Sequence, residues 1–362
     1  MTAGNLTVKP QQQVTLLGGT VINNGTITAP GGNINIASVP GTSLVRISQP
    51  GNLLSLEIEL QRDTNGEIIP INPVDLPTLL TNSGTDTGLT VNPDNSLQLN
   101  DSGVTIPNQI GTTIISGNLD VSSSLGGNID ILGNQVGLIG ATINASGNNG
   151  GGNIRIGGDE QGNGNVPNAD ITYVSPDSTI NADAVLAGDG GKIIVFAEEV
   201  ARIFGKLSAR GGADNGDGGF VETSGLQELE ITTTPDVGAS LGSGGEWLID
   251  PYNIEIVPAG NAPVNVDTAN PFTFTATGNN AQIPVNLILD ALTGGSSVTL
   301  TTSGGGSQEG NIVVNAAIGY SNRGANNTLT LDADNDTALC DVMRYSKKNP
   351  PKSPLERYRW RT

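Results

Sequence analysis

One short motif returns throughout this 362-residue chain and limits what the chain can fold into. It consists of two glycines, one variable residue, and then apolar residues at alternate positions. Successive copies in the middle of the chain lie 25 to 39 residues apart, which is typical of a solenoid or another repeat array. The copies are GGNINI from Gly31, GGNIDI from Gly126, GGNIRI from Gly151, GGKIIV from Gly190, and the looser GGFVET from Gly218, GGEWLI from Gly244 and EGNIVV from Glu309.

The alternation separates the two faces of a predicted strand. The fourth and sixth motif positions are apolar in nearly every copy, whereas the fifth varies in size and charge. Since successive side chains of a strand point to opposite faces, the fourth and sixth positions face a core and the fifth faces outward. The fourth positions are Ile129, Ile154, Ile193, Val221, Trp247 and Ile312; the sixth are Ile131, Ile156, Val195, Thr223, Ile249 and Val314; the fifth are Asp130, Arg155, Ile194, Glu222, Leu248 and Val313.

A second element accompanies the motif, with a large aliphatic residue and then Ala two positions later. Its copies are Ile27 with Ala29, Ile143 with Ala145, Ile180 with Ala182, and Leu207 with Ala209. Each repeat therefore holds two or three short strands joined by Gly and Asn turns. Because like residues recur at equivalent positions, we expect each coil to stack in parallel on the previous one. The predicted fold is an all-β parallel β-helix with a narrow aliphatic core and coils about 4.8 Å apart.

Two segments interrupt this rhythm. A Pro- and Asn-rich stretch predicts an excursion from the rod, with Asp75 capping a helical turn through Leu80. Later, "IPVNLILDALTGG" places apolar residues on one helical stripe and predicts a short helix near 284–293. The predicted organisation is coils over 1–60, the excursion over 61–100, a central β-helix over 101–260, further coils over 261–336, and an atypical basic tail over 337–362.

The tail differs from the rest of the chain in several ways at once. It holds the one cysteine, Cys340, and seven of the sixteen basic residues, and it lacks glycine. One interpretation is a basic binding tail. The abrupt change in composition favours the other, a frameshifted end that did not evolve with the repeats. We expect it to stay outside the rod.

Composition excludes several classes of function. The net charge of −19 disfavours nucleic acid and anionic membrane surfaces as partners. With no histidine and one cysteine, the chain has no Ser-His-Asp triad, no Cys/His zinc site and no internal disulfide. No apolar run is long enough for a membrane-spanning helix, and the start "MTAGNLTVKPQQQ" does not read as a signal peptide.

The glycine-rich stretch "GGGNIRIGGDEQGNG" raises the question of a phosphate site. It lacks the Gly-Lys-Ser/Thr of a P-loop and the strand-to-helix context of a dinucleotide fingerprint. Asp159 and Glu160 would repel a phosphate. Since the glycine pair has many copies, we interpret it as structural punctuation and expect no cofactor.

Two acidic turns are weak calcium candidates. "GGADNGDGG", Gly211–Gly219, resembles a calcium-binding nonapeptide, but it stands alone rather than in tandem. "DADND", Asp332–Asp336, starts like an EF-hand loop, but Thr337 takes the glycine position and Met343 the twelfth. Solvated acidic turns are the favoured interpretation, so no metal site is predicted.

Catalysis is the main rival class, because parallel β-helices also host polysaccharide lyases and hydrolases. Glu198 and Glu199 are adjacent, so on a strand they would point to opposite faces. The one basic cluster within the repeats is Arg202, Lys206 and Arg210, which reads better as the polar face of a strand. The aromatic residues Trp247, Tyr252, Phe272 and Phe274 are assigned to core or cap. We therefore predict a protein without enzymatic activity or catalytic residues.

These motifs resemble the filamentous haemagglutinin family of bacterial exoproteins. The resemblance covers most of Asn5 to Asp336 and rests on long runs. The runs are "APGGNINIASVPGTSLVRISQPGNLLSLEI", "GGGNIRIGGDEQGNGNVPNADITYVSPDSTINADA", "GGKIIVFAEEVARIFGKLSARGG", "GGFVETSG" and "LIDPYNIEIV". The family implies a right-handed parallel β-helix, two-partner secretion through an outer-membrane transporter, an extracellular or cell-surface place, and cell adhesion.

From the resemblance we expect a structural or adhesive segment of a larger secreted protein, lacking the family's N-terminal secretion domain. Cell-surface or matrix glycans are the expected ligands of such an adhesin, and the family supplies no catalytic residues. The alternative is a β-helix that binds or degrades polysaccharides. Because uncovered strands present unpaired backbone groups, we also expect end-to-end self-association.

Overall fold

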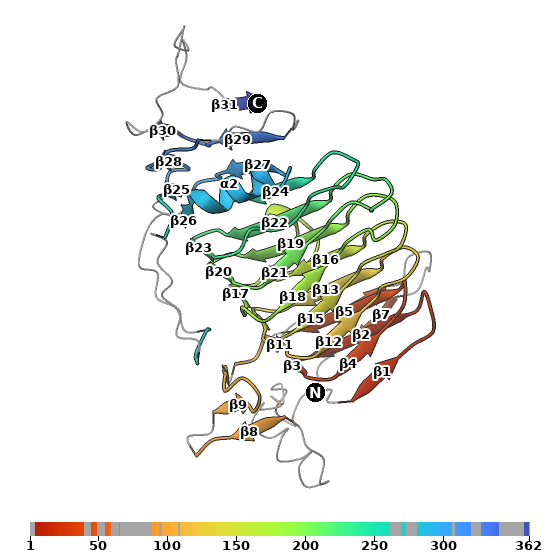
Figure 1. Cartoon of the computed structure of the whole chain (residues 1–362). Helices are drawn as coiled ribbons and strands as arrows, with labels where there is room; N and C mark the ends of the chain where they lie inside the picture. Colours follow the sequence, from red (N-terminus) through yellow and green to blue (C-terminus); the bar gives the residue numbers. More distant parts are fainter. Residues whose placement is uncertain are drawn as a thin grey trace, which may run out of the picture.

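Short strands of successive coils pair in parallel and form the sheets that make up most of the molecule. The computed structural model describes residues 4–39, 45–48, 55–58, 65, 88–93, 96–107, 109–260, 269–272, 281–305, 308–319, 327–339 and 358–361. Over these residues the chain is mostly β, as predicted, and the layers lie one above another (Figure 1). No described helix is both long and apolar enough to cross a membrane.

Three parallel sheets form the body of the molecule. The long sheet contains β2 (Gln13–Gly18), β5 (Asn33–Ser38), β13 (Asn128–Leu132), β16 (Asn153–Ile156), β19 (Lys192–Ala197), β22 (Phe220–Gly225), β24 (Glu246–Ile249), β27 (Ser297–Thr301), β29 (Thr328–Asp332) and β31 (Tyr358–Arg361). The first lateral sheet contains β3 (Thr20–Asn23), β11 (Thr112–Ile115), β14 (Gln135–Leu138), β17 (Ile171–Val174), β20 (Val200–Ile203) and β23 (Glu228–Ile231). The second lateral sheet contains β1 (Asn5–Thr7), β4 (Thr26–Thr28), β12 (Asn118–Asp120), β15 (Thr142–Asn144), β18 (Thr179–Asn181) and β21 (Lys206–Ser208).

Between β11 and β22 the chain visits these sheets in a fixed order: first lateral, second lateral, long. Each strand pairs in parallel with its counterpart one coil later. The register of the long sheet aligns Ile129, Ile154 and Ile193, as the motif predicts. Val221 and Trp247 follow in the same row. This path makes the architecture solenoid-like.

The core is the narrow space between the three sheets. The inward positions of the motif are fully buried, from Ile34 through Ile154 to Trp247. The small Ala residues of the second lateral element, such as Ala145 and Ala182, are buried in the same cluster. Trp247 donates its indole N–H to the Thr223 hydroxyl at 2.9 Å, which satisfies the polar atoms of both. Aliphatic side chains stacked on like side chains therefore account for the predicted core.

The glycine pairs lie where consecutive coils come closest. A Cβ placed on Gly152 would be 2.0 Å from the carbonyl oxygen of Gly127, and one on Gly191 would be 2.0 Å from that of Gly152. The first glycine of a pair is equally confined, since a Cβ on Gly151 would be 2.0 Å from the carbonyl oxygen of Ala182. No side chain fits at such distances. Backbone packing between coils thus requires the glycine pair, which supports its interpretation as a structural element and not a phosphate site.

The excursion is longer than predicted. The last coil before it ends with β5, and the next coil begins with β11, which pairs in parallel with β3. The alternating stretch 54–60 was expected to belong to the coils, but β7 (Ser55–Ile58) pairs antiparallel with β6 (Val45–Ser48) as a separate ribbon. An alternating pattern fits a hairpin as well as a coil, which is why the boundary was misplaced. The turn predicted from Asp75 to Leu80 lies outside the described residues.

Part of the excursion covers the outer face of the first lateral sheet. Three antiparallel strands form a small sheet: β8 (Leu89–Val91), β9 (Leu97–Leu99) and β10 (Thr105–Ile106). Their apolar side chains pack with Ile114, Tyr173 and Phe204 in a second hydrophobic cluster, separate from the main core. The small sheet therefore helps to bury the outer apolar side chains of this lateral sheet.

The last coils depart from the regular path. A terminal sheet has the order β26 (Ala281–Pro284), β25 (Ile254–Val257), β28 (Ile312–Val314), β30 (Thr337–Leu339). Ile312 belongs to this sheet and not to the row of Ile154, so its assignment from the EGNIVV copy is wrong. In the long sheet the strand that follows β24 is β27, with Val298 inward. Both segments alternate, so the pattern alone did not separate them.

One α-helix occurs among the described residues and matches the prediction near 284–293. It is α2 (Val285–Thr293), which buries Leu287, Ile288 and Leu292 against the main core. It lies between β26 and β27, the place of a second-lateral strand in earlier coils. The left-handed glycine after it is Gly295, with φ of 92°.

The tail was expected to stay outside the rod, but parts of it pair with the sheets. β30 pairs in parallel with β28, and β31 pairs antiparallel with β29 at the end of the long sheet. Residues 340–357 between them lie outside the described ranges. The low glycine content of the tail did not reveal its capacity for strand pairing.

Replacing Gly152 with Ala should destabilise the fold. The added methyl would overlap the Gly127 carbonyl oxygen, so two coils must separate, at a cost on the order of 3 kcal/mol. Urea denaturation followed by circular dichroism measures the change. Gly319→Ala is the matched control, because a Cβ there would meet nothing within 4 Å. Equal stability of the two variants would contradict the role given to the glycine pair.

Candidate functional site

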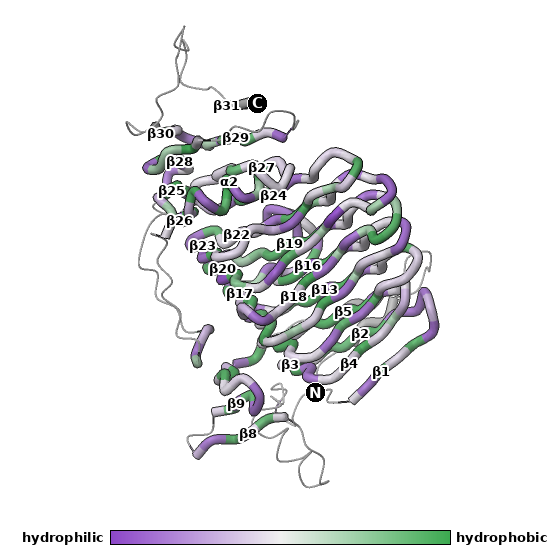
Figure 2. Tube along the Cα trace, viewed as in Figure 1, coloured by the Kyte–Doolittle hydropathy of each residue, from purple (hydrophilic) through white to green (hydrophobic). Residues whose placement is uncertain are grey.

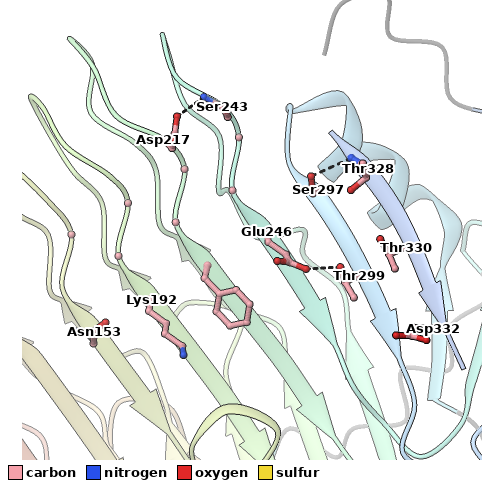
Figure 3. Close-up of a pocket in the computed structure, with 18 residues that line it drawn as sticks. Asn153, Lys192, Asp217, Ser243, Glu246, Ser297, Thr299, Thr328, Thr330 and Asp332 are labelled. Carbon is pink, nitrogen blue, oxygen red and sulfur yellow. Dashed lines mark hydrogen bonds between the residues drawn. The ribbon is translucent and has the colours of Figure 1, made fainter. Parts of the chain in front are cut away.

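An open groove runs along the outer face of the long sheet. One residue per coil points outward at the start of each strand, and the register aligns Asn153, Lys192, Phe220 and Glu246. The row continues with Ser297. Figure 3 shows Asn153, Lys192, Glu246 and Ser297 along the groove. Because equivalent positions of stacked coils lie about 4.8 Å apart, the row forms a linear array suited to an extended ligand.

The groove has a volume of about 900 Å³. Its lining includes the glycine pairs Gly190–Gly191 and Gly218–Gly219. Hydrogen bonds fix several of its walls: Thr299 Oγ1 donates to Glu246 Oε1 at 2.5 Å, and the Ser243 backbone N–H donates to Asp217 Oδ1 at 2.7 Å (Figure 3). The groove is therefore preformed.

Phe220 is the aromatic residue of the groove. It is only half-buried, and Lys192 Nζ lies 5.2 Å from its ring centroid. A cation over an aromatic face is favourable and holds both side chains in place. In a chain with 3% aromatic residues, a ring on the outer face is unusual. Together the two side chains offer an apolar face beside a positive charge.

A loop, the strap (residues 157–170), covers the next outward row. It connects β16 to β17 and contains the short helix η1 (Glu160–Gly162). It packs on Phe196, since a Cβ on Gly162 would lie 2.6 Å from the Phe196 ring. Beneath it lie Ile194 and Glu222, both buried although they occupy the predicted outward positions.

Glu222 is held by the strap. It is fully buried, and its two carboxylate oxygens accept hydrogen bonds from the Gln161 backbone N–H at 3.0 and 3.1 Å. Gln161 adopts a left-handed conformation, with φ of 52°, which is uncommon for a residue with a side chain. Its side-chain amide donates to Asp250 Oδ2 at 3.0 Å. One strap residue thus contacts two buried carboxyl groups.

Ion pairs fasten the strap at its edges. Arg155 contacts Asp130 and Asp159, each at 2.7 Å, and Lys192 pairs with Glu160. Lys192 therefore belongs to both the strap and the groove. A smaller hollow of about 260 Å³ lies beside these pairs and shares Asn153 and Lys192 with the groove. Its cations are already neutralised by carboxylates, so it does not form an anion site.

Burial changes the acidity of the covered carboxyl groups. Burial raises the pKa of Glu222 to about 8, although the hydrogen bonds from the Gln161 backbone N–H oppose the change. Burial likewise raises the pKa of Asp250 to about 6. Glu222 is therefore mostly protonated and neutral at pH 7, which avoids an uncompensated buried charge.

The structure separates the basic cluster Arg202, Lys206 and Arg210. Arg202 is buried on the first lateral sheet, where it faces Glu230 and donates to the Pro271 carbonyl at 2.8 Å. Lys206 is exposed on the second lateral sheet, and Arg210 pairs with Asp236 at 2.7 Å. These residues form no common site.

The carboxylate pair Glu198 and Glu199 lies in a bend after β19 and not on a strand, so the strand argument does not apply to it. Both are exposed, and Glu198 accepts a hydrogen bond from Asn168 of the strap at 3.2 Å. Asp159 and Glu160 were expected to repel a phosphate. In the structure Asp159 pairs with Arg155, and Glu160 pairs with Lys192.

The acidic turns do not gather into a metal site within the part of the chain that is described. There, no group of three or more His, Cys, Asp or Glu could hold a metal ion. Asp217 of the first turn and Asp336 of the second accept backbone N–H hydrogen bonds. The predicted lack of a metal or cofactor remains a prediction.

The four aromatic residues assigned to core or cap differ in where the structure places them. Trp247 is in the main core and Phe272 in the second cluster, as predicted. Tyr252 is half-buried, and its ring covers Gly305. Phe274 lies outside the described residues. Phe220 was not singled out, although its motif position predicts an exposed side chain.

The strap and its buried carboxylates were also missed. A signal existed at the fifth motif position, where Ile194 and Leu248 are apolar and flank Glu222 in neighbouring coils. Apolar residues on both faces of a strand indicate that both faces are covered.

No family model and no curated protein matches the chain.

Stability should decrease as pH rises from about 5 to about 9, in part because of Glu222. A carboxyl group whose pKa rises from 4.5 unfolded to about 8 folded stabilises the fold fully below the lower value, and this stabilisation is lost as pH rises through the higher one. Glu222→Gln mimics the protonated acid, so it should match wild type near pH 5 and exceed it by a few kcal/mol near pH 9.

Denaturation curves of both proteins at the two pH values measure this difference. Glu199→Gln is the control for the loss of one charge, because Glu199 is exposed in a bend. If Glu222→Gln and Glu199→Gln shift the pH dependence equally, then net charge, and not burial under the strap, governs it.

Proposed function

We propose that this chain is a non-catalytic structural and adhesive segment of a large secreted protein resembling filamentous haemagglutinin, folded as a right-handed parallel β-helix. The parallel stacking of coils, the cyclic order of the three sheets and the narrow aliphatic core support this proposal. Repeat proteins of this kind present long surfaces on a rigid rod. Secretion through an outer-membrane transporter and a cell-surface place belong to the same proposal and rest on the sequence resemblance.

The observation that carries the adhesive role is the groove around Phe220. A linear glycan is a fitting ligand, because its sugar units advance by a distance comparable to the coil spacing of about 4.8 Å. The face of a sugar ring can pack on Phe220, and its hydroxyls can bond to Asn153, Glu246 and Thr299. Pockets with one apolar surface and a few fixed polar groups are typical of specific binding sites.

Phe220→Ala should weaken glycan binding. The wild-type chain is screened on an array of cell-surface and matrix glycans, and the best oligosaccharide is then titrated calorimetrically. We expect at least tenfold weaker binding by the variant, about 1.4 kcal/mol or more, because the apolar contact is lost. Ile110→Ala, an exposed aliphatic residue away from the groove, should bind like wild type. Absence of any glycan ligand, or equal binding by Phe220→Ala, would contradict the groove as the adhesive site.

Polysaccharide degradation is the second candidate, and one observation favours it. Glu222 and Asp250 contact the same strap residue, and their pKa values differ, as general acid and base groups require. Both side chains are almost completely buried, however, so a substrate reaches them only if the strap moves away. We therefore rank binding above degradation.

The purified chain should release no reducing ends from neutral or acidic polysaccharides, with or without Ca²⁺. A reducing-sugar assay over several hours measures this. Release that disappears in Glu222→Gln but persists in Glu199→Gln would establish the degrading enzyme instead.

A further inference from the structure

The turns that lead into the long sheet form a second surface, the turn ridge. Their backbones hydrogen-bond from coil to coil, so they stack side by side beyond the sheets (Figure 1). For example, the Leu186 N–H donates to the Asn148 carbonyl at 3.0 Å, and the Asp214 N–H donates to the Leu186 carbonyl at 2.8 Å. The turn ridge comprises residues 122–126, 146–151, 183–190, 210–217 and 236–243.

Most of the large exposed apolar side chains of the described residues are on this ridge. Leu125, Val185, Leu186 and Leu241 are 62%, 50%, 51% and 75% exposed. Tube colours in Figure 2 show hydrophobic stretches among the turns. Elsewhere in the described ranges, exposed large hydrophobic residues are limited to Leu6 and Ile110, at 37% and 40%. A group of exposed aliphatic residues on one surface indicates an interaction site.

The ridge is also acidic and rigid. Its turns carry five aspartates and one arginine, and Arg210 is paired with Asp236. Asp189 and Asp217 each accept a backbone N–H from the following coil, at 2.8 and 2.7 Å, which fixes their carboxylates. A second copy of this chain would bring like charges together, and an anionic membrane surface would be repelled. The charge thus favours a basic partner.

The spacing of the leucines indicates the shape of that partner. Leu125, Leu186 and Leu241 lie in turns two coils apart, so they are separated by about 10 Å along the rod. Residues i and i+7 of an α-helix are also about 10 Å apart and lie on the same face. An amphipathic helix parallel to the rod therefore places successive apolar residues against successive leucines.

We propose that the turn ridge binds a basic amphipathic helix of a protein partner, aligned along the rod axis. The leucines contact the apolar stripe of the helix, and the flanking aspartates contact its lysines and arginines. The ridge meets the groove at Gly151, Gly190, Asp217 and Ser243, but its exposed leucines do not line the groove, and the interaction does not depend on the proposed function. The rigid backbone ladder limits the entropy lost when the helix binds.

The test uses a synthetic 18-residue peptide with leucine at i, i+7 and i+14, further leucines beside them, and lysines on the flanks. The comparison peptide has the same composition in scrambled order, so it keeps the charge without the apolar stripe. Fluorescence anisotropy measures binding of both to the full chain. We expect the patterned peptide to bind at least tenfold more tightly. Equal binding of the two would overturn the proposal, because charge alone would then explain it.

Ridge variants locate the site. Leu186→Ser and Leu241→Ser should each weaken binding of the patterned peptide several-fold, and Asp214→Asn should reduce its dependence on salt. Ile110→Ser and Phe220→Ala should bind it like wild type, which separates this surface from the groove. Circular dichroism confirms that each variant is folded. Unchanged binding by both leucine variants would overturn the proposal, as would a dimer in light scattering that Leu186→Ser abolishes, because the occupant is then a second copy.

Discussion

The close approach of backbones at the glycine pairs is the constraint on which the rest of the structure depends. A carbonyl oxygen of one coil occupies the space where a Cβ of the next would lie, as between Gly127 and Gly152. Coils stacked this tightly keep one register, so outward side chains align in rows. The glycine pairs that permit this stacking also line part of the groove.

Alignment into rows has a second consequence, because a row must be either polar or covered. Near the beginning of the rod an asparagine ladder solves the problem: Asn128 donates to Asn33 at 2.7 Å, and Asn153 donates to Asn128 at 2.9 Å. In the next outward row Ile194 and Leu248 are apolar, and the strap shields Ile194 from water. The strap that covers this row also buries Glu222, and this burial raises the pKa of its carboxyl group.

The sequence predicts what alternation and repetition determine, and little else. The inward rows containing Ile154 and Ala145 follow from residue type and spacing alone. The limits of the excursion do not, because a β-hairpin and a coil both alternate, as the stretch 54–60 shows. The strap contains no repeat and no alternation, so its place over Glu222 depends on three-dimensional packing that a periodic pattern does not encode. Phe220 is an intermediate case, since its outward position is predictable but its contact with Lys192 is not.

A stacked rod links binding to stability. Apart from the strap, whose Gln161 reaches past the adjacent coil to Glu222 and Asp250, the coils contact mainly their neighbours, so the fold is held largely by a sum of adjacent interfaces. A ligand along the groove or the ridge contacts several coils at once and binds only when all of them are in register. It therefore stabilises the interfaces it spans, in proportion to its affinity for the folded rod. A ligand that contacts one coil stabilises that coil, whereas a long, linear ligand stabilises every interface that it spans.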